Sequence, residues 1–392
     1  MTKSSPMRAP DRNPDVVSTK KACYVGVDGK ARKVKKIYTG VANKARKVKK
    51  AYVGVGGKAR LFYSAEQKLA YHGTVTELSE RRYALAATTV GGYALFGGGY
   101  ANNALATVDA YSTSLVHSTA TPLSGVKYDL SATTVGNYGL FGGGYIGGGI
   151  TSTVDAYSAS LVRTTTTSLN KARAYLAATT VGNYGLFGGG TNNKSYFSTV
   201  DAYSASLVHS TPTLLSVGRK ELAATTVGGY GLFGGGYASH GITSTVDAYS
   251  ASLVRTTPTP LSNARYDMAA TTVGDYGLFG GGKSNNNFST STVDAYSASL
   301  VRSTAASLSE ARGSFAATTV GNYGLFAGGY DSGSDYFSTV DIYSISLVRS
   351  TATPLSKVRG GMAATSVGGY GLFAGGFYSS VRYSTVDAYT VV

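Results

Sequence analysis

Seven near-copies of one cassette occupy most of this 392-residue chain. Each copy reads approximately A-A-T-T-V-G-x-Y-G-L-F-G-G-G and is followed, after a variable stretch, by S-T-V-D-A-Y-S. The phenylalanine of the cassette recurs at intervals of 45 to 47 residues, at Phe96, Phe141, Phe187, Phe233, Phe279, Phe326 and Phe373. A period of this length that holds several short β-type runs is typical of the blades of a β-propeller and not of a helical solenoid.

The repeat that spans residues 222–262 illustrates the strands expected in one blade. Residues 222–227 and 230–233 predict the first two strands, joined by a Gly-Gly turn. Residues 244–249 predict the third strand, and residues 253–261 the outer strand, where two prolines suit a sheet edge. The small side chains of the first strand fit seven copies crowded around an axis, and the triple glycine lets backbones approach closely.

The two ends of the repeat region predict how the blades are completed. The last copy has a third strand at residues 384–389 and then ends at Val392 without a fourth. Residues 69–79, ahead of the first copy, align with residues 253–262 of the sample repeat with one extra residue. We therefore expect an all-β fold over residues 65–392, a seven-bladed β-propeller of four-stranded blades closed by the N-terminal strand.

Residues 1–64 differ from the repeats in charge and pattern. They contain 17 Lys and Arg against three Asp, a net charge of +14, whereas the rest of the chain has 19 Lys and Arg against 17 Asp and Glu. Residues 23–64 hold three copies of a 14-residue unit, each with a short β run, a turn dipeptide and a second run that is mostly basic, which predicts a small β-hairpin segment. Residues 1–22 are expected to form a flexible arm.

The in-register aromatic and basic residues of these units suggest an attachment or oligomerisation segment. The residues that we assign to this role are Tyr24, Tyr38, Tyr52, Lys33 and Lys47. The regular hairpin period favours docking to an acidic site on a particle, or self-association, over nucleic-acid binding, which Lys and Arg density alone would also permit. A solvated basic tail is the remaining interpretation.

Both parts of the chain resemble known families. The blade units resemble the kelch repeat, with a basic residue before the inner strand, an aromatic residue before a diglycine and a tyrosine ending the third strand. The chain lacks the tryptophan that kelch repeats usually have in the fourth strand. The corresponding basic residues are Arg82, Lys127, Arg173, Arg219, Arg265, Arg312 and Arg359, and the tyrosines are Tyr111, Tyr157, Tyr203, Tyr249, Tyr296, Tyr343 and Tyr389. The 14-residue units are similar to those of tail-associated proteins from phages and prophages of Gram-positive bacteria, which implies a place on a virion.

The residue inventory argues against an enzyme and against a bound cofactor or metal. Cys23 is the only cysteine, which rules out an intrachain disulfide, and His117 and His209 occupy a repeat position that elsewhere holds arginine. We interpret this position as a basic residue that blunts pairing at the outer edge of the blade. The aspartate of each S-T-V-D-A-Y copy is expected to pair with the repeated arginine rather than to catalyse or to bind Ca²⁺. Because no apolar run reaches signal-peptide or membrane length, we expect a protein made in the cytoplasm without membrane insertion.

The seven copies, compared with one another, predict where a ligand binds. The turns between strands one and two and between strands three and four barely vary, whereas the loops between strands two and three, and the residues after each repeated basic residue, differ between copies. In an up-and-down blade these variable segments emerge on one face, and their Tyr, Asn, Ser and Gly content suits recognition of sugars. Relaxed drift of exposed loops is the alternative explanation. The candidate ligand-binding residues are Tyr100, Asn102, Asn103, Tyr128, Tyr145, Tyr175, Asn192, Asn193, Tyr196, Tyr237, Tyr266, Asn285, Asn286, Tyr330, Asp335, Tyr336, Tyr378, Arg382 and Tyr383.

Together these features predict a non-enzymatic structural protein of a phage particle, of the tail-fibre, receptor-binding or decoration type. Its expected partners are other virion proteins of the tail or baseplate, a host-surface glycan or protein, and a second copy of the chain through residues 23–64. The alternative is an intracellular kelch-type protein-interaction propeller whose basic arm binds nucleic acid.

Overall fold

The computed structural model describes residues 68–392 in full and, before them, the backbone of six strands between Tyr24 and Ser64. The chain divides into two compact units, Met1–Gln67 and Lys68–Val392. The expected flexible arm, residues 1–22, and the turn dipeptides of the hairpins lie outside the described residues.

The described strands of the N-terminal unit form three antiparallel hairpins. The pairs are β1 (Tyr24–Val27) with β2 (Lys30–Lys33), β3 (Tyr38–Val41) with β4 (Lys44–Lys47), and β5 (Lys50–Val55) with β6 (Lys58–Ser64). The register places Tyr24 opposite Lys33, Tyr38 opposite Lys47, and Tyr52 opposite Leu61. Each 14-residue unit of the sequence therefore corresponds to one hairpin.

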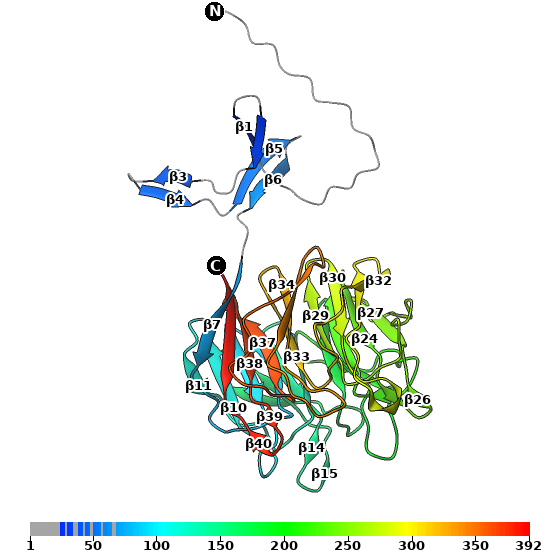
Figure 1. The fold of residues 1–392 in the computed structure, drawn as a ribbon. Helices are drawn as coiled ribbons and strands as arrows, with labels where there is room; N and C mark the ends of the chain where they lie inside the picture. Colours follow the sequence, from blue (N-terminus) through cyan, green and yellow to red (C-terminus); the bar gives the residue numbers. More distant parts are fainter. Residues whose placement is uncertain are drawn as a thin grey trace, which may run out of the picture. The chain divides into compact units, whose positions relative to one another are not determined.

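Residues 68–392 form seven four-stranded antiparallel sheets, the blades of a β-propeller (Figure 1). Blade 1 comprises β8 (Ala86–Val90), β9 (Tyr93–Gly97), β10 (Val108–Ser112) and β11 (His117–Thr119). Blade 2 comprises β12 (Ser131–Val135), β13 (Tyr138–Gly142), β16 (Val154–Tyr157) and β17 (Arg163–Thr166). Blade 3 comprises β18 (Ala177–Val181), β19 (Tyr184–Gly188), β20 (Val200–Ser204) and β21 (His209–Ser210). Blade 4 comprises β23 (Ala223–Val227), β24 (Tyr230–Gly234), β27 (Val246–Ser250) and β28 (Arg255–Thr256). Blade 5 comprises β29 (Ala269–Val273), β30 (Tyr276–Gly280), β31 (Val293–Ser297) and β32 (Arg302–Ala305). Blade 6 comprises β33 (Ala316–Val320), β34 (Tyr323–Ala327), β35 (Val340–Ser344) and β36 (Arg349–Thr351). Blade 7 comprises β37 (Ala363–Val367), β38 (Tyr370–Ala374), β41 (Val386–Val391) and β7 (Leu69–Val75).

The outer strands are shorter than the sequence analysis predicted. The expected strand over residues 253–261 is reduced to β28, which covers only Arg255 and Thr256. Proline explains the difference, because it lacks the N–H that a sheet ladder needs. Outer strands span two residues where a proline stands at the fourth position (Pro212 and Pro258) and three where it stands at the sixth (Pro122 and Pro354). Without a proline they span four residues in blades 2 and 5 and seven in β7 of blade 7.

The seventh blade combines the two ends of the propeller unit, as predicted. β7 pairs antiparallel with β41, and a β-bulge between Ala388 and Tyr389 skips His72, which is the extra residue that the alignment required. The first strands of successive blades contact one another in order, and β37 of blade 7 contacts β8 of blade 1. Thr89 Oγ1 also donates a hydrogen bond to the carbonyl of Ser366 across this contact, at 2.7 Å.

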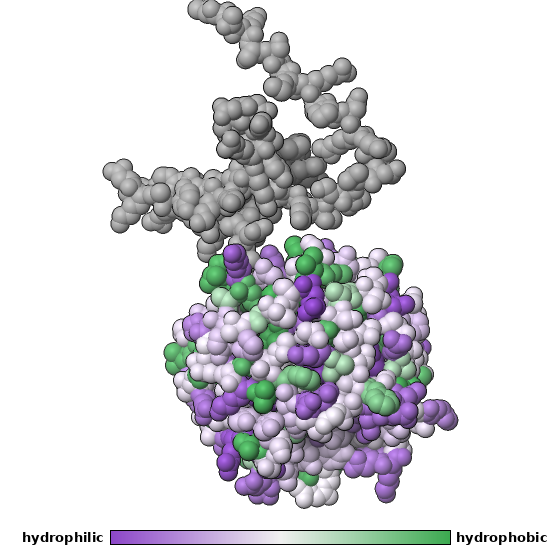
Figure 2. Space-filling model, viewed as in Figure 1, coloured by the Kyte–Doolittle hydropathy of each residue, from purple (hydrophilic) through white to green (hydrophobic). Residues whose placement is uncertain are grey.

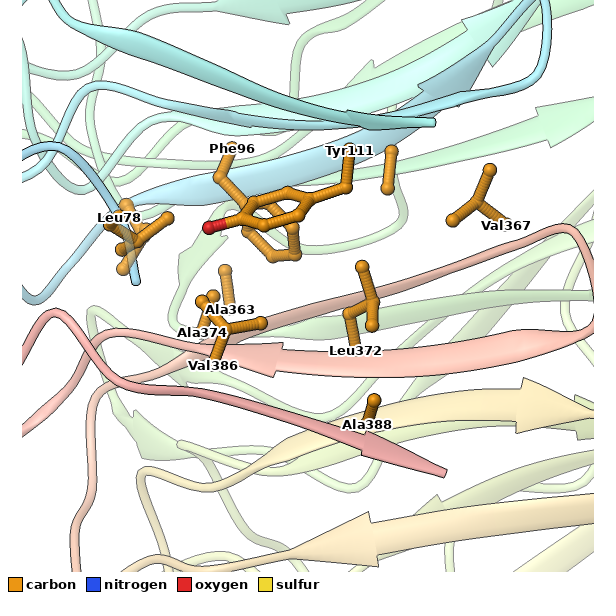
Figure 3. Close-up of a cluster of buried hydrophobic side chains, with 11 residues drawn as sticks. Leu78, Phe96, Tyr111, Ala363, Val367, Leu372, Ala374, Val386 and Ala388 are labelled. Atoms are coloured by element: carbon orange, nitrogen blue, oxygen red, sulfur yellow. The ribbon is translucent and has the colours of Figure 1, made fainter. Parts of the chain in front are cut away.

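The apolar core lies between neighbouring blades. Figure 3 shows one such cluster, in which Phe96 and Tyr111 of blade 1 face Leu372 and Val386 of blade 7. In blades 1 to 5 a glycine ends the second strand and makes this packing possible, whereas alanine stands there in blades 6 and 7. A Cβ on Gly97 would lie 2.8 Å from the ring of Phe141 in the next blade, so no larger residue fits there without a shift.

Each blade also contains a buried aspartate that accepts hydrogen bonds from several sides. In blade 5, Asp294 Oδ2 accepts from Arg265 Nη2 at 2.6 Å, and both side chains are fully buried. The backbone N–H of Ser262 donates to the same carboxylate. The equivalent pairs of the other blades measure 2.5 to 2.9 Å, and in blade 2 Lys127 takes the place of arginine. The expected structural pairing of the repeated aspartate and basic residue is confirmed.

The basic residues of the outer strands have a different role from the one predicted. Rather than pointing away to blunt an edge, they reach the other oxygen of the same aspartate, as Arg302 Nη1 does to Asp294 Oδ1 at 3.0 Å. His117 and His209 do the same to Asp109 and Asp201, at 2.6 and 2.7 Å. The edge-blunting interpretation is therefore wrong, because these side chains complete the buried carboxylate's hydrogen bonds.

The surface of the propeller unit is mixed in character. In the view of Figure 2, polar and intermediate residues cover most of it, and apolar residues lie scattered among them. Within the described part of the chain, no helix is long and apolar enough to cross a membrane.

Candidate functional site

The two variable segments of each blade pair with each other at one end of the propeller. In six of the seven blades, the residue that follows the repeated basic residue forms an isolated antiparallel bridge with the first residue of the loop between strands two and three, as Tyr83 does with Tyr100 and Tyr128 with Tyr145. In blade 4 the same pairing is a short ladder between β22 (Arg219–Lys220) and β25 (Tyr237–Ala238). The loop hairpins β14 (Tyr145–Ile146) with β15 (Gly149–Ile150) and β39 (Phe377–Tyr378) with β40 (Val381–Arg382) lie at this end, opposite the end where the chain terminates (Figure 1). The structure thus places both variable segments on one face, which we call the variable face.

The next residue of each blade lies in the left-handed backbone region and belongs to one hydrogen-bonded circuit. These seven residues, with φ between 50° and 65°, are Ala84, Asp129, Tyr175, Glu221, Asp267, Ser314 and Gly361, and we call them the axial circuit. Each donates its N–H to the carbonyl of the equivalent residue of the adjacent blade at 2.8 to 3.3 Å, and the bond from Ala84 to Gly361 links blade 1 to blade 7. Only glycine adopts this conformation without strain, so backbone geometry does not explain the other six side chains.

Aromatic rings cover much of the variable face. A continuous series with centroids 4.9 to 6.0 Å apart crosses five blades and consists of Tyr378, Tyr336, Tyr330, Phe377, Tyr83, Tyr100, Tyr128, Tyr145 and Tyr175. A second, shorter series joins Tyr196, Tyr237 and Tyr266. Rings held by their neighbours offer contact area with little side-chain entropy left to lose on binding.

The axial circuit surrounds a central depression of about 850 Å³. Its wall includes circuit side chains such as Asp129, Glu221 and Asp267, together with rings of both aromatic series. A second pocket of about 670 Å³ lies between the loops of blades 1 and 2, where Tyr128 and Tyr145 form part of its wall. Both volumes fall within the usual range for small-molecule sites.

The depression is lined by charged groups that are mostly paired. Lys220 Nζ lies 3.0 Å from Glu221, and Lys283 Nζ lies 3.1 Å from Asp267. Burial alone would lower the pKa of Lys283, but the Asp267 carboxylate raises it overall. Burial raises the pKa of Glu221, although Lys220 opposes the change.

Asp129 differs from the other two carboxylates. The hydroxyl of Tyr175 donates a hydrogen bond to it, but within residues 68–392 no ion pair joins it to a lysine or arginine. Burial, with a smaller contribution from the nearby Glu221 and Asp267, raises the pKa of Asp129 to about 7, although the hydrogen bond from Tyr175 and the charge of Lys220 oppose this rise. The pKa of Tyr175 is also raised, by burial and by Asp129.

The structure distributes the predicted site residues over several places. Those in the wall of the central depression are Tyr128, Tyr175, Tyr196, Tyr237, Tyr266 and Tyr330. Those in the second pocket are Tyr100, Asn103, Tyr128, Tyr145 and Asn193, and Asn285 lines a third pocket of about 480 Å³. Those outside these three pockets are Asn102, Asn192, Asn286, Asp335, Tyr336, Tyr378, Arg382 and Tyr383.

Several of the outlying candidates have contacts within the protein. Asn192 Oδ1 accepts hydrogen bonds from the backbone of Lys194 and Ser195, so it shapes its own loop. The ring of Tyr383 lies 4.9 Å from Lys357 Nζ. Arg382 donates to the carbonyl of Ser380 and lies 6.0 Å from the ring of Tyr83.

The sequence analysis missed the charged residues of the depression. It recognised that the positions after each repeated basic residue vary, but it selected their tyrosines and not Asp129, Glu221 or Asp267. A usable signal was present, because the second residue after each basic residue differs in type in nearly every copy. Lys283 was missed in the same way, at the start of a variable loop.

Among the described residues, no group of three or more His, Cys, Asp or Glu side chains is arranged to hold a metal ion. The three carboxylates of the depression come from different blades and two of them are paired with lysine. What the depression offers chemically is therefore hydrogen bonding, aromatic stacking and charge.

These features define the class of the protein as a β-propeller whose variable residues gather on one face. Many solved structures match the chain. One is YjhT, to which the chain is 12% identical with a TM-score of 0.57, the match covering 71% of this chain and 99% of that one. At this identity the likeness supports the fold alone. No family model and no curated protein matches the chain.

Proposed function

We propose that this chain is a non-enzymatic structural protein of a phage-like particle, of the tail-fibre, receptor-binding or decoration type, found on the virion. Its variable face binds a glycan or protein of the host surface. Its N-terminal hairpins attach it to tail or baseplate proteins, and they also offer a surface for self-association.

One observation carries the binding part of this proposal. The axial circuit holds seven residues in the same backbone conformation and with the same backbone hydrogen bonds, yet its side chains range from none in Gly361 to a phenol in Tyr175. Variation on a fixed frame, beside a depression lined by tyrosines, is the arrangement of a recognition surface.

The attachment part is supported by the N-terminal unit. The charge of residues 1–64 is +14, and the repeated hairpins place Tyr24 opposite Lys33 and Tyr38 opposite Lys47. A strongly basic segment suits an acidic site on a particle. The resemblance of these units to those of phage tail-associated proteins points to the same location.

A glycan array with the purified full-length chain tests the binding proposal. The double substitution Tyr128→Ala and Tyr266→Ala removes one ring from each aromatic series and is expected to lower binding at least tenfold. Val208→Ser, at a position 65% exposed in a turn at the opposite end of the blade, is the matched control and should bind as the wild type does. Equal binding by the double variant and the control would contradict the proposal.

The alternative function, an intracellular interaction propeller with a nucleic-acid-binding arm, is favoured by the same basic segment. Binding of the full-length chain to duplex DNA, followed as a function of salt, separates the two. A steep loss of affinity with salt, reduced by Lys33→Gln and Lys47→Gln, would support the alternative, because counterion release makes phosphate contacts salt-dependent. Recovery of the chain in purified phage-like particles would support the virion.

A further inference from the structure

The charge pattern of the central depression is incomplete by one cation. Three carboxylates and two lysines line it, and each lysine is committed to one carboxylate, Lys220 to Glu221 and Lys283 to Asp267. Asp129 is left with a hydroxyl donor, Tyr175, in place of a positive charge. An uncompensated carboxylate in a partly desolvated site attracts a cation more strongly than one in water does.

Aromatic rings stand around this same carboxylate. Tyr83, Tyr128 and Tyr175 line the depression with Asp129, and burial, together with the charge of Asp129, raises the pKa of all three hydroxyls. Tyr100 connects the rings of Tyr83 and Tyr128, with centroids 5.8 and 5.0 Å away. A carboxylate among tyrosine rings is the environment that an organic ammonium ion prefers, because the ion pair and the ring faces both attract it.

We propose that the depression binds an amino sugar through its free, protonated amine, with the ammonium group placed between Asp129 and these rings. The inference rests on the proposed function and deepens it, because it names the class of glycan that the variable face recognises. Neutral N-acetylated sugars would leave Asp129 without a counter-charge, and anionic sugars would add to the excess of carboxylates.

A sugar fits the remainder of the depression better than a lysine side chain does. Beyond Asp129 the wall presents further hydroxyls and paired charges, including Tyr266, Ser314 and the Lys283–Asp267 pair. Ser314 Oγ donates to Asp267 at 2.6 Å, so this side is already organised for hydrogen bonds. The hydroxyls of a pyranose can add hydrogen bonds to the donors and lone pairs that these pairs leave over, whereas the aliphatic stem of a lysine can add none.

The test uses two oligosaccharides with the same sugar backbone, one with free amines and the other with neutral acetamides in their place. Isothermal titration of the full-length protein at pH 7 with the glucosamine tetramer is expected to give an affinity at least tenfold above that of the N-acetylglucosamine tetramer. Asp129→Asn should abolish this difference while the protein still unfolds in a cooperative thermal transition. Asp275→Asn, in the turn between the first two strands of blade 5, is the control that should preserve the difference.

Three results would overturn the inference: equal affinity for both tetramers, absence of binding to the glucosamine tetramer, or a preference retained in Asp129→Asn. Tetralysine is the third ligand, and binding of tetralysine equal to or tighter than that of the glucosamine tetramer would show that the site selects a peptide ammonium instead. If the inference fails but the Tyr128→Ala, Tyr266→Ala variant still loses glycan-array binding, the proposed function stands with another ligand.

Discussion

Substitution of Asp294 by alanine tests what the buried ion pairs contribute to the blades. The change leaves the guanidinium of Arg265, which is fully buried, without its anionic partner. Removing one partner of a buried pair typically costs about 3–5 kcal/mol, because the remaining charge stays desolvated. By contrast, Arg302→Ala removes a side chain that is 25% exposed and leaves the Arg265–Asp294 pair intact, so we expect a loss of about 1 kcal/mol or less.

Urea denaturation followed by far-UV circular dichroism measures both effects, because the chain has no tryptophan to report by fluorescence. The conservative control is Arg265→Lys, which copies the Lys127–Asp155 pair of blade 2, formed at 2.8 Å. We expect the midpoint to fall several times further for Asp294→Ala than for Arg302→Ala, and least for Arg265→Lys. Equal shifts for Asp294→Ala and Arg302→Ala would refute the reasoning, since the fully buried pair would then contribute no more than the partly exposed one.

Three further predictions concern closure, pH and backbone strain. Deletion of residues 69–75 removes β7 and leaves β41 as an unpaired edge, so the melting temperature in scanning calorimetry should fall by more than about 5 °C. An unchanged melting temperature would contradict the closing role of β7. The pKa of Asp129 is raised in the fold from 3.8 to about 7, so ionisation of this carboxyl destabilises the fold as pH rises through that interval. Asp129→Asn should therefore raise the melting temperature relative to the wild type at pH 8 but not at pH 4. The same difference at both pH values would show that ionisation is not the cause. Glu221→Gly relieves a left-handed backbone (φ 54°) and should stabilise the fold by about 1 kcal/mol in urea denaturation, whereas a loss of stability would show that its ion pair with Lys220 outweighs the strain.

The fold could be predicted from the sequence largely because it is repeated. Seven near-copies of A-A-T-T-V and Y-G-L-F predict two strands per blade, and the missing fourth strand after Tyr389 directs attention to residues 69–79. The repeat pattern did not predict the length of the outer strands. In an outer strand the hydrogen-bond ladder needs backbone N–H groups, and proline removes one at a position that differs between copies, as at Pro212 and Pro122.

The candidate site was predicted less completely, for a different physical reason. Variation between copies located the face, and composition favoured its tyrosines, several of which do line the depression. Variation marked the positions of Asp129, Glu221 and Asp267 but did not indicate that their charges share one site, because they come from separate blades and are single residues in otherwise similar repeats. Only the backbone circuit, which sets these positions side by side, shows that they share one site.

The axial circuit also bears on whether the variable face reflects binding or drift. Exposed loops can vary because nothing depends on them, but the circuit residues have satisfied backbone hydrogen bonds and a conformation in which a side chain is strained. Glycine would fill all seven positions at lower energy, and Gly361 shows that the frame accepts it. Tyr175 and Glu221 are therefore residues that the fold tolerates at a cost of about 1 kcal/mol each. Strained backbone positions cluster at ligand-binding sites, so such residues at the rim of a depression are consistent with the proposed recognition surface.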